Sequence, residues 1–390
     1  MAHCSEMLEN DLGNNASALH RGKQTKLVTL LITTECNLRC TYCYVYQYSG
    51  DRMSLETAKK VIQESFATAV GMFDRIEFAF LGGEPFCAFQ LLREICEWTW
   101  QEQWPLPYLF SASTNGTLLG QETRKWLIKH HRQIYLSLSY DGLTDAQDKN
   151  RCASGRWIDL RFFRRYWPDI PVKMTIMEQN VSHLFENIQH LNQIGLQVND
   201  TFADGVPPWS DTSLKKLDHQ LGLLCDAQLR TPQRHPSDLL SMDLTAILSV
   251  CDRNLFSCGA GDSRITYDWD GVRYACHLLS PLCLTKLQLD GIPDQLHAGR
   301  EQTDKCRTCP LDNICPHCEG YSYRMYQSLW RREEKNCRLF RHQLFFACRF
   351  QMKQILNKDE LSEQDLIVFQ AVRKVLMTKV MHEIASEISC

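Results

Sequence analysis

The chain has 390 residues, of which 44% are hydrophobic and 23% are charged, and its formal net charge is −3. This composition is that of a folded protein with room for two or three domains. The balanced charge argues against a nucleic-acid partner, and no apolar run of about eighteen residues exists that could span a membrane.

Residues 1–25 are a polar lead-in without the apolar core of a signal peptide. Residues 26–204 then alternate apolar β-type runs with helical patterns. We expect strands in KLVTLLITT, RIEFAFLGG, PYLFSASTNG, QIYLSLSYDG, PVKMTIME and LQVNDTFAD. Helices are expected in MSLETAKKVIQESFATAV, where Ser54 is the N-cap, and near 88–103, 120–132, 156–166 and 181–194. Six strands alternating with helices predict an α/β fold with a parallel sheet and right-handed crossovers.

Three strands end in residues that suit a binding site. The stretches LGGEPF, STNGTLL and SYDGL place Gly, Asn or Asp where a strand meets the following loop. In α/β barrels and open α/β sheets, ligands bind at this carboxyl edge. The alternative is that these residues only form the βα turns.

The remaining chain divides into three further segments. Residues 205–257 begin with the breaker GVPPWSD and continue as a helical linker. Residues 258–340 contain the predicted hairpin SRITYDWDGVRYAC, with Asp270 and Gly271 in its turn. Residues 341–390 return to a helical pattern and form a C-terminal helical segment.

Cysteine is the unusual feature of the composition, with 19 residues. No export signal is present, so we expect a reducing, cytoplasmic compartment, where many cysteines indicate metal binding rather than disulfides. Three cysteines lie at 36–43, and a second set follows between 258 and 337. We expect five scattered cysteines to be small core residues: Cys87, Cys96, Cys152, Cys225 and Cys348.

The first set, in TTECNLRCTYCYVY, has the spacing C-x3-C-x2-C, with Cys36, Cys40 and Cys43. Three thiolates can hold three irons of a 4Fe–4S cluster and leave the fourth iron open to another ligand. A zinc site would need a fourth ligand, and no histidine lies close in sequence. A redox C-x-x-C pair would leave Cys36 unexplained.

This cysteine motif after the first strand, with Tyr42 before its last cysteine and Gly82-Gly83-Glu84-Pro85 after the second strand, resembles the radical SAM superfamily. The resemblance covers 26–204 and implies a partial (β/α)6 barrel. It also implies that S-adenosylmethionine chelates the open iron through its amino and carboxylate groups. Reductive cleavage would then give methionine and a 5′-deoxyadenosyl radical that abstracts hydrogen from a substrate.

The resemblance also suggests cofactor contacts outside the cysteines. Gly82, Gly83, Glu84 and Pro85 would meet the methionine amino group, and Tyr42 would lie near the adenine. Contacts to the ribose or carboxylate would come from strand ends, at Ser113, Asn115, Ser139 and Arg151. For these polar residues, capping of their own loops is the alternative role.

The second cysteine set resembles the SPASM extension of radical SAM enzymes, which usually binds two auxiliary 4Fe–4S clusters. By this resemblance, one cluster would be held by Cys306, Cys309, Cys315 and Cys337, and the other by Cys258, Cys276 and Cys318. The chain departs from the family in having two residues, not three, between Cys315 and Cys318. A zinc ribbon is the alternative for CRTCPLDNICPHC, but its cysteine pairs are too close together for the usual spacing.

The matched cysteines supply seven of the eight thiolates that two full clusters need. The missing ligand could be Cys251, Cys283 or a carboxylate such as Asp262, or the iron could stay open to substrate. We expect an open or non-cysteine site, because an unmatched cysteine is more often a buried structural thiol.

Enzymes with this extension modify ribosomally made peptides and proteins. In sulfatase maturases an aspartate base follows the cysteine that matches Cys276, whereas this chain has His277. The lead-in is too short for a fused peptide-recognition domain, so a leader peptide would bind the catalytic domains directly or use a separate recognition protein.

The sequence is therefore interpreted as a maturase that crosslinks side chains of a precursor peptide, in a carbon–carbon or cyclophane bond, with electrons from a donor such as flavodoxin or ferredoxin. Thioether formation or oxidation of a protein residue is the alternative reaction. A non-catalytic iron–sulfur scaffold or electron carrier is the alternative of another class, but a carrier has no need of Gly-Gly-Glu-Pro.

Overall fold

The protein is described by a computed structural model that covers most of the chain. The described residues are 25–46, 48–203, 208–231, 236–249, 258–293, 306, 308–332 and 337–388. The polar lead-in, apart from Thr25, and the candidate ligand Cys251 lie outside these residues. None of the helices in the described ranges is long and apolar enough to cross a membrane.

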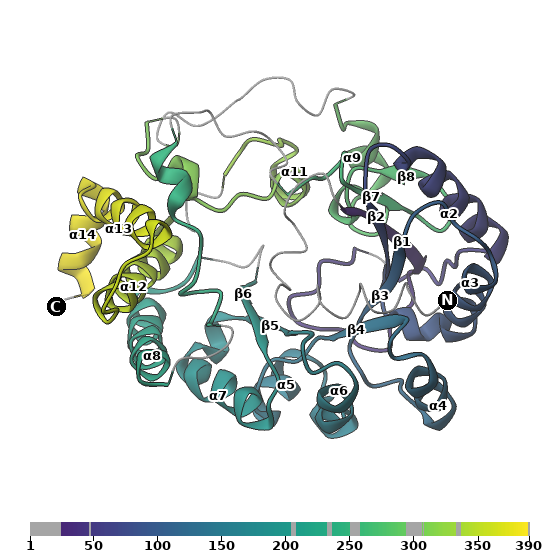
Figure 1. Ribbon diagram of the computed structural model, residues 1–390, viewed down its shortest axis with the longest axis horizontal. Coiled ribbons are helices and arrows are strands. Elements are labelled where there is room, and N and C mark those ends of the chain that lie inside the picture. Colours follow the sequence, from purple (N-terminus) through teal and green to yellow (C-terminus); the bar gives the residue numbers. More distant parts are fainter. Residues whose placement is uncertain are drawn as a thin grey trace.

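Six parallel strands form the curved wall that the sequence predicts. They are β1 (Thr25–Thr33), β2 (Arg75–Gly82), β3 (Tyr108–Thr114), β4 (Ile134–Leu138), β5 (Val172–Ile176) and β6 (Val198–Phe202). Strands β1 to β4 are neighbours in one sheet, and β5 pairs with β6 in a second. A parallel bridge between Ser139 and Lys173 joins the two sheets, so the six strands follow one another around an open arc (Figure 1).

Helices cover the outer side of this arc. They are α2 (Leu55–Ala69), α3 (Phe89–Gln101), α4 (Gln121–His130), α5 (Thr144–Asn150), α6 (Leu160–Tyr166) and α7 (Leu184–Ile194). Single 3-10 turns precede three of them, at η3 (Pro85–Ala88), η4 (Gly155–Trp157) and η5 (Glu178–His183). Ser54 caps α2 as predicted, because its hydroxyl accepts a hydrogen bond from the Thr57 amide at 3.0 Å. Helix α5 was not predicted, because its residues TDAQDKN carry no apolar periodicity.

The two faces of the strands differ in chemistry. Outward side chains such as Val28, Phe78 and Phe110 are fully buried in the main core against the helices. The alternate side chains form what we call the inner face, which includes Glu77, Ser111, Ser113, Ser137, Lys173, Thr175 and Arg264. None of these seven side chains is buried, so solvent reaches a polar inner face.

The cysteine-rich extension joins the same sheet. The predicted hairpin forms β7 (Arg264–Tyr267) and β8 (Arg273–Tyr274), and its turn places Gly271 at a φ of +82°, a conformation that favours glycine. The sequence did not predict that β7 pairs in parallel with β1, Leu27 facing Arg264 in the register. The rest of the extension contains short helices, η7 (His277–Leu279), α9 (Lys286–Asp290), η8 (Asp312–Ile314) and α11 (Glu319–Tyr326).

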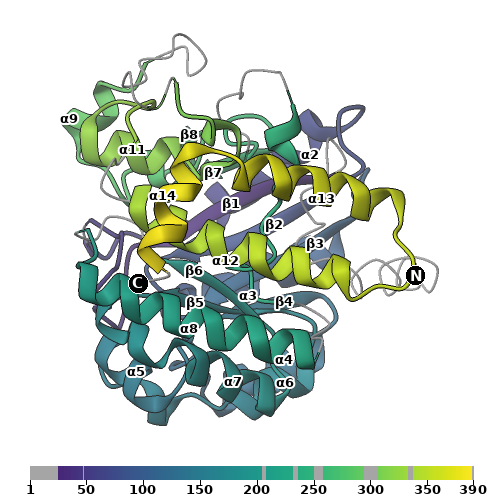
Figure 2. The ribbon, with the colours of Figure 1, turned by 90° about the vertical axis from the view of Figure 1, so that its left-hand side faces the viewer.

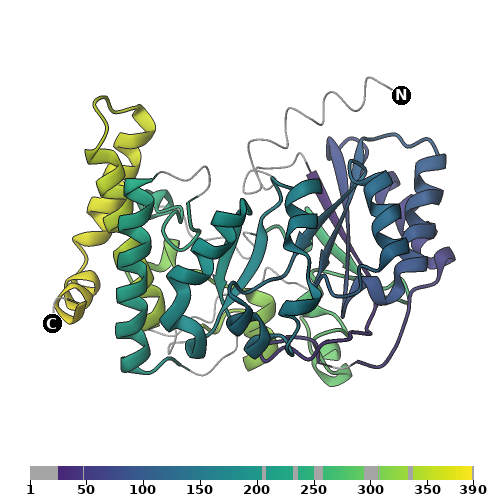
Figure 3. The ribbon, with the colours of Figure 1, turned by 90° about the horizontal axis from the view of Figure 1, so that it is seen from below.

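Four longer helices form a layer at the other end of the molecule, seen from the side in Figure 2 and from below in Figure 3. They are α8 (Asp211–Arg230), α12 (Cys337–Leu356), α13 (Glu363–Leu376) and α14 (Lys379–Ile388), and the 3-10 turn η6 (Thr245–Leu248) packs on α13. Helix α12 lies between α8 and α13. The domain boundaries remain a prediction, but α8 packs on both α7 and α12.

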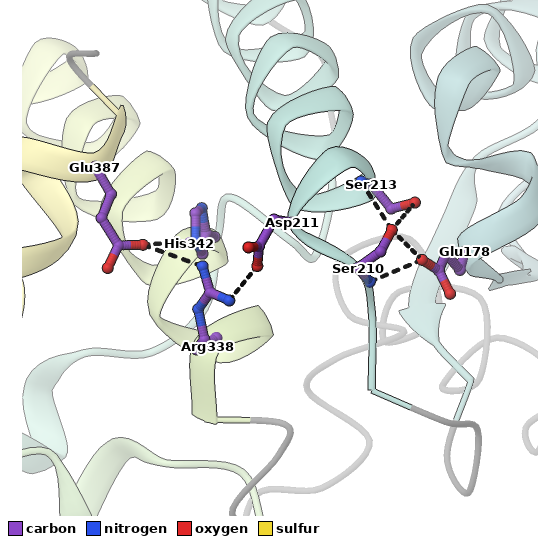
Figure 4. A network of polar contacts seen from close by, with 7 residues as sticks. All are labelled: Glu178, Ser210, Asp211, Ser213, Arg338, His342 and Glu387. Carbon is purple, nitrogen blue, oxygen red and sulfur yellow. Dashed lines mark hydrogen bonds and ion pairs between the residues drawn. The ribbon is translucent and has the colours of Figure 1, made fainter.

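Polar contacts fix the ends of these helices together (Figure 4). Ser210 caps α8 and also donates its hydroxyl to Glu178 at 2.8 Å. Arg338 in the first turn of α12 pairs with Asp211 and, at 3.3 Å, with Glu387 of α14. Ser210 thereby joins α8 to the barrel turn η5, and Arg338 joins α12 to α8 and α14.

Candidate metal centre

The first three cysteines lie on the loop that follows β1, which we call the cysteine loop (residues 34–46). The loop is held in a tight turn by its own backbone, because the Cys43 amide donates to the Cys40 carbonyl at 3.1 Å. The sulfurs also accept hydrogen bonds, Cys36 from the Leu38 amide at 3.4 Å and Cys43 from the Tyr48 hydroxyl at 3.2 Å. Amide and hydroxyl donors to sulfur are typical of thiolates that ligate iron.

The three residues fit an iron–sulfur cluster better than a single metal ion. The cysteines that the structure describes are thiols rather than disulfides, and Cys36, Cys40 and Cys43 are partly exposed. No set of three or more ligands within the described ranges converges on one ion position. In a cluster each thiolate binds its own iron, so convergence is not required. Burial raises the pKa of Cys36 to about 12 and that of Cys40 to about 11, so bound iron would have to ionise them.

The Gly-Gly-Glu-Pro stretch after β2 packs directly on the start of the cysteine loop. The Gly83 amide donates to Thr33 at 3.0 Å, and the Glu84 amide donates to the Glu35 carbonyl at 2.7 Å. A Cβ on Gly82 would overlap the Thr33 carbonyl oxygen, and one on Gly83 would overlap that of Glu35. Both glycines are therefore required by the close approach of two backbones.

Glu84 joins this stretch to the loop after β3. Its buried carboxylate accepts hydrogen bonds from the Thr114 hydroxyl at 2.7 Å and from the amides of Asn115, at 2.7 Å, and Phe86, at 3.1 Å. Burial raises the pKa of Glu84 to about 7 despite these donors. Both Glu84 carboxylate oxygens thus accept hydrogen bonds from within the protein. The next residue, Pro85, begins η3.

Asn115 and Ser113 are also engaged within the protein. The Asn115 side chain donates to Asn37 of the cysteine loop at 2.9 Å and accepts from the Thr117 amide at 3.0 Å. These are the loop-capping contacts that the sequence allowed as an alternative. Ser113 accepts from the Lys173 ammonium at 2.8 Å, and the Ser139 amide donates to the Thr114 carbonyl at 2.8 Å.

Tyr42 and Arg151 meet at a buried carboxylate. Asp141 accepts from the Tyr42 hydroxyl at 2.7 Å, from Asn150 at 3.0 Å and from Arg151 at 3.2 Å. The Arg151 guanidinium lies 5.2 Å from the centre of the Tyr42 ring, so the ring and the ion pair support one another. These contacts fix the cysteine loop to the end of α5. Asp141 belongs to SYDGL, one of the three strand ends that the sequence predicts to suit a binding site.

One expected core cysteine is not in the core. Cys96, Cys225 and Cys348 are buried as predicted and Cys87 is half-buried, but Cys152 is exposed. Its sulfur accepts the Arg39 amide of the cysteine loop at 3.1 Å, and its φ is +55°, rare for a residue with a side chain. The sequence analysis failed here because no apolar run places Cys152 on a helix or strand.

Cys258 and Cys276 lie near one another, and the first turn of α11 packs on Cys276. The charges of Cys258 and Cys276 interact, and a Cβ on Gly320 would lie 3.2 Å from the Cys276 sulfur. Because Cys318 immediately precedes α11, which contains Gly320, the three cysteines Cys258, Cys276 and Cys318 can share one cluster.

The other four cysteines lie around η8 and the start of α12. The Cys309 amide donates to Cys306 at 3.2 Å, and the Cys315 amide donates to Leu311 at 2.9 Å, so a short turn holds these three. Cys337 is the first residue of α12. The ligand assignment of both auxiliary clusters remains a prediction.

Cys283 lies between the two cysteine sets. Its thiol is 1% exposed and packs with Leu31 and Leu282, and its charge would interact with those of Cys276 and Cys43. Asp262, the carboxylate alternative, is exposed. The packing of Cys283 is that of a buried thiol, and whether it ligates a cluster remains a prediction.

His277 follows Cys276 in the extension and packs against the cysteine loop. Its ring centre is 5.3 Å from that of Tyr44 in the cysteine loop. Burial, together with the positive charges of Lys173 and Arg264, lowers the pKa of His277 to about 4, so its imidazole is neutral near pH 7. The cysteine loop, the extension and the inner face therefore meet at this histidine.

Comparison with known proteins supports this arrangement. A family described as a 4Fe-4S single cluster domain matches residues 21–152. The cysteine-type anaerobic sulfatase-maturating enzyme of Clostridium novyi is 25% identical over 182 residues, 42% of this chain and 47% of that enzyme. The chain spans about half the length of the curated relatives that it matches, 60% and 47% for two of them.

Two solved structures share the fold. Native anSMEcpe with bound AdoMet superposes with a TM-score of 0.63 at 16% identity and covers 86% of this chain and 100% of that one. Streptococcus suis SuiB bound to precursor peptide SuiA gives a TM-score of 0.57 at 14% identity, with 80% and 76% of the two chains covered. Identities this low show a common fold.

Proposed function

We propose that this chain, which has the fold of radical SAM enzymes with a SPASM extension, is a peptide maturase that crosslinks side chains of a ribosomally made precursor. The observation that carries the proposal is the cysteine loop itself. Hydrogen bonds join it to Glu84, just after β2, and to Asn115, just after β3, at the carboxyl edge of the parallel sheet. That edge is where α/β folds bind their ligands.

The cluster and S-adenosylmethionine would supply an electron and a 5′-deoxyadenosyl radical that abstracts hydrogen from the peptide. Cys36, Cys40 and Cys43 would hold the cluster and leave one iron for the cofactor. Gly82 and Gly83, which allow the close approach to Thr33 and Glu35, would meet the cofactor's methionine end. Tyr42 and Arg151, held by Asp141, would contact the cofactor elsewhere. The protein would thus position the cysteine loop and hold it in place.

The proposed partners follow from this chemistry. SuiB is described as bound to its precursor peptide, and anSMEcpe has been solved with a Cp18Cys peptide. By analogy we expect this chain to act on a precursor peptide in the cytoplasm. Flavodoxin or ferredoxin would be the electron donor, and a separate leader-recognition protein is a further candidate partner.

Two alternatives compete with crosslinking. Thioether formation or oxidation of a protein residue would use the same centre, and similarity to sulfatase-maturating enzymes favours the latter. His277 argues against it, since it replaces the aspartate that the family resemblance places after Cys276. A non-catalytic iron–sulfur carrier would not need the glycine packing at Gly82 and Gly83.

The first experiment replaces Cys36, Cys40 and Cys43 together with alanine. After anaerobic reconstitution, the variant should lose about four irons per chain, one cluster's content, and should form no 5′-deoxyadenosine. Cys225→Ala, a buried cysteine on α8, is the matched control and should retain both. Deoxyadenosine formation by the triple variant would show that the cleaving cluster lies elsewhere.

The second experiment identifies the reaction. The protein is co-expressed with a precursor peptide encoded beside it, and the product is analysed by mass spectrometry. Each crosslink should lower the peptide mass by two hydrogens. If turnover is supported by a small molecule and by no peptide, the maturase proposal is wrong.

A further inference from the structure

Lys173 is a cation on the inner-face side of β5. Its ammonium donates one hydrogen bond, to the Ser113 hydroxyl at 2.8 Å. An ammonium carries three N–H donors, so two remain for another acceptor. The side chain is exposed although barrel strands flank it on both sides, which places it where a ligand on the inner face can reach it.

The charges around Lys173 favour an anion. Within the described ranges no carboxylate lies within ion-pair distance of the Lys173 ammonium. Glu77 and Arg264 act on it from a greater distance with opposite signs, so the three groups together carry a net positive charge. Glu77 is already bonded to the Ser111 hydroxyl at 2.5 Å. An arriving carboxylate would therefore gain a charge-assisted hydrogen bond without displacing an ion pair.

The position of Lys173 and Arg264 is one that a substrate would reach. Lys173 and Arg264 both act on His277, which packs against Tyr44 of the cysteine loop. The two cations thus lie where the inner face, the cysteine loop and the extension meet. The carboxylate of S-adenosylmethionine is the other anion expected near the cysteine loop. The family resemblance gives it Arg151 as partner, which lies beside Tyr42 and Asp141.

We propose that Lys173, with Arg264 also on the inner face, binds a carboxylate of the peptide substrate and so selects peptides with an acidic group next to the modified residue. The inference rests on the proposed function for its substrate class. The carboxylate can belong to an Asp or Glu side chain or to the peptide's carboxyl terminus. Lys173 is then a specificity-determining residue of the reaction.

The test uses reconstituted full-length protein and three synthetic pools of random heptapeptides. One pool has Glu at its centre and an amidated carboxyl terminus, the second has Gln there and the same amide, and the third has Gln with a free carboxyl terminus. Binding is measured by ultrafiltration and mass spectrometry. Lys173→Met removes the charge, Lys173→Arg keeps it, and Lys125→Met changes an exposed lysine on the outer helix α4 as control.

The parent should retain either acidic pool about tenfold or more over the Gln-amide pool, the effect expected of a hydrogen bond to a charged group. Lys173→Met should abolish this preference, whereas Lys173→Arg and Lys125→Met should keep it. Equal retention of all three pools by the parent overturns the proposal. So does a Lys173→Met variant that keeps the preference, or one that instead loses affinity for S-adenosylmethionine in calorimetry.

Failure of the proposed function would look different. In that case the parent would form no 5′-deoxyadenosine from S-adenosylmethionine after reduction, whatever the peptide pools show.

Discussion

Replacing Gly83 with alanine should displace the cysteine loop and lower both iron content and stability. An alanine Cβ at this position would lie 2.6 Å from the Glu35 carbonyl carbon and 2.7 Å from the Thr34 carbonyl oxygen. Non-bonded carbon atoms pack at about 3.5–4.0 Å, so the backbone before Cys36 must move by about 1 Å.

The free energy of unfolding should fall by about 2–4 kcal/mol. Overpacking of this kind costs about 1–3 kcal/mol. The shift would also break the hydrogen bond from the Glu84 amide to the Glu35 carbonyl, whose loss adds about 1 kcal/mol. Because Cys36 follows Glu35 directly, the same movement should misplace the first thiolate of the cluster.

The measurement compares urea unfolding of the metal-free protein and iron bound after reconstitution. Gly222→Ala is the control, because this glycine lies inside α8 and its new Cβ would meet Phe346 at an ordinary 3.7 Å. The control should gain roughly 0.5–1 kcal/mol, since alanine favours a helix interior. A Gly83→Ala protein that unfolds at the parent's urea concentration and binds the parent's iron would refute the reasoning.

Three further predictions concern single side chains. Tyr48→Phe removes the hydroxyl donor to the Cys43 sulfur. A redox titration should show a lower reduction potential of the cluster without loss of iron. An unchanged potential would contradict this. Burial raises the pKa of Asp200 to about 6, above its unfolded value, so the parent should lose up to about 3 kcal/mol of stability as pH rises from about 4 to 6. Asp200→Asn should flatten that dependence in urea melts, and parallel curves for the two proteins would disprove it. Cys283→Ala should keep all of the parent's iron, whereas loss of one cluster would identify Cys283 as the missing ligand.

The sequence was sufficient wherever local chemistry determines the structure. The six strands, the Ser54 cap and the 270–271 turn each depend on neighbouring residues, and all three are confirmed. The Gly82-Gly83 pair was singled out through the family resemblance as a cofactor contact, whereas the close approach of two backbones that requires glycine there is seen only in the structure.

What the sequence did not reveal depends on contacts between distant residues. Asp141 was predicted at a strand end suited to binding, but its hydrogen bonds from Tyr42, Arg151 and Asn150 were not. Lys173 looked like one polar residue in a short strand, and only the arc of strands shows that it reaches Ser113 two strands away. Such side chains carry no periodic pattern, so a single sequence cannot place them.

The pairing of β7 with β1 sets a condition on any attempt to exchange parts between related enzymes. Because β7 supplies the neighbour on one side of β1, a barrel cut before residue 264 would expose the backbone donors and acceptors of its first strand. Bare strand edges pair with other chains and aggregate. A chimera that grafts a foreign cysteine-rich extension onto this barrel must therefore bring a strand in the register of Leu27 with Arg264, or retain the native hairpin and join the foreign segment after it.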